Sequence, residues 1–242
     1  DELTRSQLSL GTPQQVAAKN KLALMIVREL GSLEIGEAFE AVWQAYLDAR
    51  DPALKAASAV TLGQIQATEY APRLALDLAS INLAPVASNS RAQETVALGL
   101  VTSLWMMKEP VGFEPVFLAS IGWYSTVSKV KDTAKQAVAT MVDDPTDSLT
   151  NILGSNPDIS VKQMAVEAAF ASKAPVARKL ALLRKALRTG LDRVSSDLAD
   201  QRAAARFRTT VIQCLSSLGD RSPETVPMLI EMIGMDKRSE AS

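Results

Sequence analysis

The chain has 242 residues, of which 47% are apolar and only 5% aromatic, and its formal net charge is −1. It contains no histidine and a single cysteine, Cys214, which excludes an imidazole base, an internal disulfide and a closed Cys/His zinc site. A nearly neutral chain predicts neither nucleic-acid nor membrane binding from global charge.

The first quarter of the chain predicts helices that begin at proline or at an acidic cap. Residues 13–30 form the first helical pattern, and residues 35–50 form the second, with Trp43 and Tyr46 on its apolar stripe. Asp51 is expected to cap the next helix, with Pro52 at its first position. Gly63 is expected to end that helix by supplying a left-handed turn.

Prolines also mark the starts of later helices. Pro72, Pro115 and Pro175 each lead into an apolar helical stretch, and the last helix is expected over residues 224–234. Residues 96–107 are apolar on most sides but too short to span a bilayer, so they predict a buried central helix. Residues 190–200 predict an extended loop or an extra turn, and no run alternates as a strand would.

A short helical signature returns along the chain with variations. A cationic residue is followed mostly by small or apolar residues at plus three, plus six, plus seven and plus eight. Four copies begin at Lys55, Arg91, Lys131 and Lys162, and weaker copies lie near Ala23 and Val211. Recurrence at intervals of about 30–50 residues is typical of repeat proteins, in which stacked helix pairs share one continuous core.

This pattern resembles HEAT repeats, a family of antiparallel helix pairs related to armadillo repeats. The residues that carry the resemblance are Asp51, Leu54, Lys55, Leu62 and Gly63, with the copies at Arg91, Lys131 and Lys162. It implies an all-α, right-handed α-α superhelix, or solenoid, of about six antiparallel helix pairs over residues 12–234. Polar segments at residues 1–11 and 235–242 would flank it. In this family an acidic and a cationic residue of the second helix form ladders between repeats, a role implied for Asp51 and Asp158.

Catalytic and cofactor sites are not expected. The sequence has no Gly-rich phosphate loop, and nothing in it indicates a cofactor or a resident metal. Cys214 lies in an apolar helical pattern and is interpreted as a buried structural thiol. Asp143, Asp144 and Asp147 are interpreted as helix-capping carboxylates in a loop, with divalent-cation binding as the minor alternative.

Positive charge is concentrated in one part of the chain. From Lys173 to Arg221 there are eleven Lys/Arg and four Asp, a net of +7, which leaves −8 on the rest. A helix over residues 176–188 is expected to bury Val176 with three leucines and to carry its cations on the other side. The favoured interpretation is a solvated outer helix, followed by contact with an acidic protein and then with nucleic acid or anionic lipid. The candidate contact residues are Arg184, Lys185, Arg188, Arg193, Arg202, Arg206 and Arg208.

Two further sets of residues are candidates for contact with a partner. The family architecture implies that positions plus four and plus five of the second helices point to a concave face. On that face the candidates are Val60, Val96, Gln136 and Glu167. The face is small, mixed and weakly charged, which suits a peptide or helix of another protein. Trp123 and Tyr124 lie near a helix end, where an exposed aromatic could anchor an interface, although core packing is the commoner role.

The sequence therefore favours a non-enzymatic protein–protein interaction scaffold or adaptor, with another protein or peptide of acidic character as the expected partner. A second candidate is a nucleic-acid-binding HEAT-like protein of the DNA alkylation-repair glycosylase type, using the basic segment 173–221. The resemblance also admits a bilin lyase, or a structural subunit that self-associates through its ends. A soluble protein is expected, either cytoplasmic or exported with its signal already removed, because no membrane-spanning or signal segment is visible.

Overall fold

The computed structural model describes residues 11–84, 90–191 and 197–239, and these residues form helices and the turns between them. The expected all-α class is confirmed by 12 α-helices, with no strand in the described ranges. The α-helices are α2 (Pro13–Ser32), α3 (Phe39–Asp48), α4 (Pro52–Gln64), α5 (Ala71–Leu83), α6 (Ser90–Met107), α7 (Phe113–Ile121), α8 (Val130–Thr140), α9 (Thr146–Ser155), α10 (Ile159–Ala171), α11 (Val176–Leu191), α12 (Leu198–Ser217) and α13 (Thr225–Ser239). Short 3-10 helices are η1 (Gly36–Ala38), η2 (Thr68–Tyr70), η3 (Pro110–Gly112) and η4 (Thr126–Ser128).

Each copy of the repeated signature lies in a helix, and the copies occupy every second α-helix. The six copies, strong and weak, fall in α2, α4, α6, α8, α10 and α12. Each of the last five packs against the helix that precedes it in the chain. Residues 1–10, which precede α2, lie outside the described ranges. The described helices form five such pairs, whereas the sequence predicts about six.

The helices group into two compact units, Asp1–Val142 and Asp143–Ser242, where the sequence predicts one domain over residues 12–234. The first residues of the expected polar tail, 235–239, form the end of α13. The expected loop at residues 190–200 is shortened, since α11 ends at Leu191 and α12 begins at Leu198. Each unit therefore has its own set of helix contacts and is described separately.

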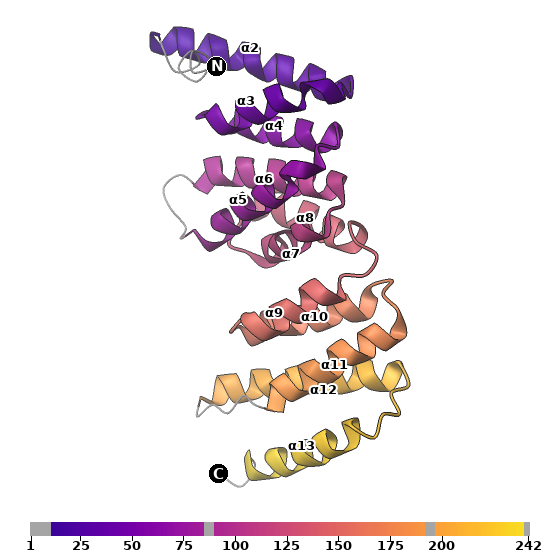
Figure 1. The fold of residues 1–242 in the computed structure, drawn as a ribbon. Helices are drawn as coiled ribbons and strands as arrows, with labels where there is room; N and C mark the ends of the chain where they lie inside the picture. Colours follow the sequence, from indigo (N-terminus) through magenta and orange to yellow (C-terminus); the bar gives the residue numbers. More distant parts are fainter. Residues whose placement is uncertain (1–10, 85–89, 192–196, 240–242) are drawn as a thin grey trace. The chain divides into compact units, whose positions relative to one another are not determined.

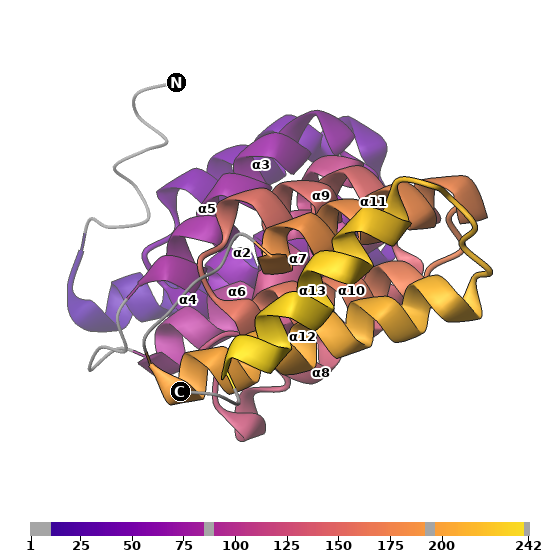
Figure 2. The same cartoon turned by 90° about the horizontal axis from the view of Figure 1, so that it is seen from below.

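In the N-terminal unit the second helices of the pairs lie side by side. Helix α4 packs against both α2 and α6, and α6 packs against α8, while α5 packs against α7 (Figure 1). Figure 2 shows α3 and α5 on one side of this unit and α4 and α6 on the other. Leu54, Leu62, Leu100 and Leu104 are fully buried between the two layers. Residues 96–107 thus belong to a buried central helix, as predicted.

Helices α4 and α6 approach each other closely because glycine occupies the contact on both. A Cβ atom added to Gly63 would lie 2.8 Å from Cα of Ser103, and one added to Gly99 would lie 2.6 Å from the carbonyl oxygen of Ala56. Both distances are below any normal carbon contact, so only glycine fits this approach. Gly63 therefore packs inside α4, and its expected role as the residue that ends the helix is wrong.

Three turns of the N-terminal unit share one local form. Glu34, Gln66 and Lys108 have φ values of 51°, 55° and 57°, and they follow α2, α4 and α6 respectively. A 3-10 helix comes next in each case and leads into the following α-helix. After α4, the N–H of Ala67 donates to the carbonyl of Leu62 at 3.0 Å, which is the long hydrogen bond of a Schellman motif. Gln66 thus takes the left-handed position that the sequence assigns to glycine.

The acidic residues of the signature cap their helices. Asp51 Oδ1 accepts the N–H of Leu54 at 2.9 Å, and Asp158 Oδ1 accepts the N–H of Ser160 at 2.8 Å. The predicted cap at Asp51 is therefore confirmed. The Lys55 ammonium lies 4.7 Å from the centre of the Tyr46 ring, so this signature cation contacts the first helix of its own pair.

A buried carboxylate organises the C-terminal unit, in which α10 packs against α9, α11 and α12, and α13 packs against α11. The side chain of Asp220 is only 3% exposed. Its carboxylate accepts hydrogen bonds from Nη2 of Arg184 at 2.5 Å and from Oγ1 of Thr225 at 2.5 Å. The hydrogen bond and charge of Arg184, helped by Thr225 and the Ser222 N–H, hold the Asp220 pKa well below its ordinary value although burial opposes this. One carboxylate thus joins α11 to the start of α13.

We predict that Gly99→Ala destabilises the N-terminal unit by about 1–3 kcal/mol, because the new Cβ overlaps the backbone of α4. Intrinsic helix propensity alone would give a gain of about 1 kcal/mol. Gly154→Ala is the matched control, since Gly154 is also helical but has no atom within 4 Å of its Cβ position. Urea unfolding followed by circular dichroism measures both. Equal effects of the two variants would contradict the close contact.

We predict that Asp220→Asn lowers the unfolding free energy at pH 7 by about 3 kcal/mol, because Arg184 loses its charged partner in a largely buried site. A carboxylate with a lowered folded-state pKa stabilises the fold above its unfolded pKa of about 3.9 and loses this effect as the pH falls toward the folded value. The melting temperature of the wild type should therefore decrease as the pH is lowered from about 5. In Asp220→Asn this decrease should be smaller.

Asp147→Asn provides the control in the same unit, because Asp147 is 89% exposed and its ion pair with Arg178 is solvated. Its effect should be much smaller than that of Asp220→Asn. An unchanged acid profile in Asp220→Asn would show that the Arg184–Asp220 pair is not the source of the pH dependence.

Candidate functional site

The N-terminal unit has a groove on the side formed by its second helices. Its volume is about 470 Å³, and its walls come from α2, α4 and α6. Ala53, Ala56 and Ala57 of α4 form part of the lining, and Val60 and Leu98 add larger apolar surface. Small side chains keep the space between the helices open, so the groove is a direct product of the alanine-rich signature.

The groove carries little charge. Thr61 Oγ1 donates to the carbonyl of Val27 at 3.0 Å, which ties α4 to α2 beside the groove. Arg28 is the one charged residue among those that line it. The groove therefore offers alanine, valine and leucine surface interspersed with the uncharged polar side chains of Ser32, Thr61, Gln64, Thr95 and Thr102.

The predicted concave-face residues are not all brought together. Val60 lines this groove, but Val96 lines a different pocket on the same unit. Gln136 is exposed on α8 away from both recesses, and Glu167 is exposed on α10 in the other unit. The prediction that plus-four positions point to the concave face is wrong in three helices. Ala59 in α4 and its counterparts in α10 and α12 are buried in the core.

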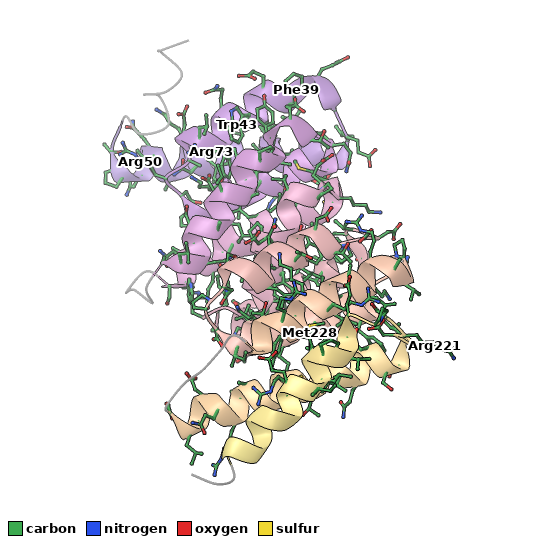
Figure 3. The ribbon with its side chains drawn as sticks, turned by 60° about the horizontal axis from the view of Figure 1, so that its bottom comes forward. Phe39, Trp43, Arg50, Arg73, Arg221 and Met228 are labelled. Atoms are coloured by element: carbon green, nitrogen blue, oxygen red, sulfur yellow. The ribbon has the colours of Figure 1, made fainter. Side chains whose placement is uncertain are left out.

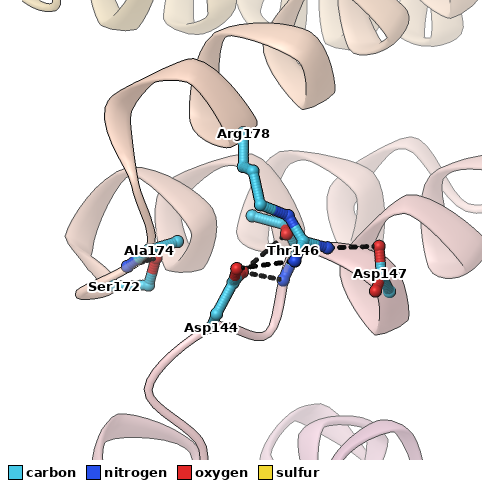
Figure 4. Close-up of polar contacts among 6 residues, drawn as sticks. All are labelled: Asp144, Thr146, Asp147, Ser172, Ala174 and Arg178. Atoms are coloured by element: carbon cyan, nitrogen blue, oxygen red, sulfur yellow. Dashed lines mark hydrogen bonds and ion pairs between the residues drawn. The ribbon is translucent and has the colours of Figure 1, made fainter.

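Several cations of the basic segment are already engaged within the C-terminal unit. Arg184 pairs with Asp220, as described above. Arg178 donates Nη1 to Asp144 at 2.9 Å and Nη2 to Asp147 at 2.5 Å (Figure 4). The pairs of Arg178 join α11 to the start of α9, so Arg178 and Arg184 each already have carboxylate partners.

Of the three predicted capping carboxylates before α9, Asp144 accepts hydrogen bonds at the start of the helix, whereas Asp143 pairs with Lys173 and Asp147 lies within α9 and pairs with Arg178. Asp144 Oδ1 accepts the N–H of Thr146 at 3.1 Å and its hydroxyl at 2.6 Å (Figure 4). Burial alone would raise the Asp144 pKa, but the Thr146 hydrogen bonds and the charge of Arg178 lower it below its ordinary value. The carboxylate is therefore a charged capping group at the beginning of a helix.

Two residues of the predicted basic segment need correction. Arg208 is buried, and its stem packs on Gly190, where a Cβ would lie 3.1 Å from the Arg208 Cγ. Val176, expected on the buried stripe of α11, is instead 52% exposed. Arg193 lies outside the described residues. The predicted contact cations that remain exposed in this segment are Lys185, Arg188, Arg202 and Arg206.

Tyr124 is buried in the N-terminal unit, and Trp123 beside it is half-buried. Tyr124 is 2% exposed, and its hydroxyl donates to Oδ1 of Asn82 at 2.6 Å. Trp123 Nε1 donates to the carbonyl of Ile81 at 3.1 Å, and the two rings stack at 4.5 Å. Burial raises the Tyr124 pKa above its ordinary value. Tyr124 therefore takes the commoner core role and not that of an exposed interface anchor, and the pair anchors the end of α7 to α5.

Sequence reasoning missed a cationic pocket on the N-terminal unit, lined by Arg50, Lys55 and Arg73. The local signals were visible, because Arg50 and Lys55 flank the Asp51-Pro52 turn and Arg73 stands four residues before Asp77. Their convergence is a tertiary effect of packing α5 beside the first helix pair. No pattern along the chain reports it.

The described residues contain no cluster of three or more His, Cys, Asp or Glu side chains that could hold a metal ion. Burial raises the pKa of the Cys214 thiol, and the nearby charge of Glu167 adds to this, so the expected buried cysteine is confirmed. No helix in the described ranges is both long enough and apolar enough to cross a bilayer.

Comparison of the chain with protein-family models, with curated proteins and with solved structures finds no match to any of them.

Proposed function

We propose that this protein is a non-enzymatic interaction scaffold of the HEAT-like solenoid type, and that its N-terminal unit binds an apolar segment of another protein. The observation that carries the proposal is the groove across α2, α4 and α6. A recess that crosses three successive second helices is the kind of surface with which repeat proteins hold extended partners.

The groove has the chemistry of a peptide-binding surface. Its lining is mainly alanine, valine, leucine and threonine, with Arg28 as the one charged contributor. An amphipathic helix or extended segment could place apolar side chains against Val60 and Leu98. A basic nucleic-acid channel would need rows of cations and exposed aromatic side chains, and neither lines this groove.

The floor of the groove supports rigid binding. Gly99 of α6 meets the backbone of Ala56, so the two helices are locked at close range. Thr61 fixes α4 to α2 by its hydrogen bond to Val27. A preformed surface loses less conformational freedom on binding than a mobile one, and this favours a scaffold role.

We predict that Val60→Lys strongly weakens capture of the partner, because it places a charge against the apolar part of the groove. Affinity capture from a lysate of the source cells, quantified by mass spectrometry, would compare full-length wild type and variant. The captured amount of proteins that bind the wild type should fall at least about tenfold in the variant, which corresponds to a loss of roughly 1.4 kcal/mol of binding free energy.

Gln136→Lys is the matched control, because Gln136 holds the equivalent plus-five position on α8 and lies outside the groove. It adds the same charge and should leave the captured proteins unchanged. Circular dichroism would check that both variants remain folded. Undiminished capture by a folded Val60→Lys variant would refute binding in the groove.

A further inference from the structure

A second recess on the N-terminal unit lies between the ends of helix pairs. It has a volume of about 450 Å³ and is lined by residues from α3, α4, α5 and α6 and from the turn at Arg50. None of its lining residues is shared with the groove described above. Arg50 and Arg73 lie on this part of the molecule, near Trp43 (Figure 3).

The charged lining of this pocket is predominantly positive. Arg50, Lys55 and Arg73 contribute three cations, and Asp77 contributes the only carboxylate. Asp77 already receives Nε of Arg73 at 3.3 Å and the hydroxyl of Tyr46 at 2.7 Å. Arg50 and Lys55 form no ion pair with any residue that the structure describes. Two positive charges therefore remain available to a ligand.

The position of Lys55 is fixed by aromatic packing. Its ammonium lies 4.7 Å from the centre of the Tyr46 ring, and that ring stacks on Trp43 at 5.4 Å. Trp43 in turn stacks on Tyr70 at 4.4 Å. Tyr46 is fully buried, and burial with the Asp77 hydrogen bond raises its pKa, so its hydroxyl remains a donor to Asp77. The cation is thus held in place before any ligand arrives.

The remaining lining distinguishes a peptide from a simple anion. Pro52, Ile81 and Val96 form an apolar wall beside the cations. Gln93 also lines the pocket, and its Oε1 is buried without a hydrogen-bond partner in the described part of the chain. A peptide N–H can satisfy such an acceptor and an apolar side chain can cover the wall, whereas an anion without a proton to donate, such as sulfate or chloride, can do neither.

We propose that this pocket binds an acidic segment of a partner protein, with a Glu or Asp carboxylate between Arg50 and Lys55 and a neighbouring apolar side chain on the wall. This inference extends the proposed scaffold function to a second, separate contact. It also moves the acidic partner from the basic segment of the C-terminal unit, where Arg178 and Arg184 are already paired, to the N-terminal unit.

The test uses the full-length protein and a positional-scanning library of hexapeptides with acetylated and amidated ends, so that no terminal carboxylate is present. The wild type should select Asp or Glu at one position, with an apolar residue beside it, by at least about tenfold over Asn or Gln. Selection should weaken as salt rises. Arg50→Glu with Lys55→Glu should reverse the preference to Lys or Arg.

Arg50→Glu alone repeats the test at an exposed site, because Lys55 is half-buried and its replacement could disturb the fold. It should reduce acidic selection several-fold in a protein that circular dichroism shows to be folded. Lys135→Glu, an exposed charge reversal on α8 outside both recesses, is the matched control and should change nothing. No acidic selection by the wild type, or acidic selection that survives the double reversal, would overturn the proposal.

Val60→Lys separates this proposal from the proposed groove. Under the present inference it keeps the acidic selection, since Val60 does not line this pocket. If Arg50→Glu loses acidic selection while Val60→Lys captures proteins normally, only groove binding is refuted. If Val60→Lys loses capture while the wild type shows no acidic selection, only the cationic pocket is refuted.

Discussion

The close approach of α4 and α6 is the constraint on which the N-terminal unit depends. Two helices that meet at glycine and alanine can bring their backbones into direct contact, and Gly63 and Gly99 make that contact from opposite sides. The same approach sets the floor of the groove. It also places the start of α6 close enough to α5 and α3 for Gln93 and Val96 to share a pocket with Arg73. Both proposed binding surfaces thus depend on the small residues, glycine and alanine, at the contact between α4 and α6.

Local features of the fold could be predicted from the sequence because their causes are local. Asp51 caps α4 through a hydrogen bond three residues away, and each signature copy lies in a helix because the spacing of its residues is helical. The role of Gly63 could not be predicted, because it is decided by a neighbouring helix. A glycine that ends a helix and a glycine that admits a neighbouring helix look the same in sequence, and Gln66 takes the left-handed position instead.

The candidate sites were harder to predict because their chemistry is decided by distant partners. Arg178 and Arg184 read as free surface cations in a net-positive segment, but the carboxylates that engage them lie 31 and 36 residues away. The cationic pocket shows the converse case, since Arg50 and Arg73 are unremarkable along the chain and meet only in the folded unit. Charge counted along a sequence therefore gives no account of which charges remain available.

The distribution of two rare residue types gives each unit its own spectroscopic reporter. All three tryptophans, Trp43, Trp105 and Trp123, belong to the N-terminal unit, whereas the single thiol, Cys214, belongs to the C-terminal unit. Because Cys214 is buried, its reaction with a thiol reagent must wait for α12 to open. Intrinsic fluorescence and thiol labelling can thus follow the two halves of the unmodified protein independently, and show whether they open in one cooperative event or in two.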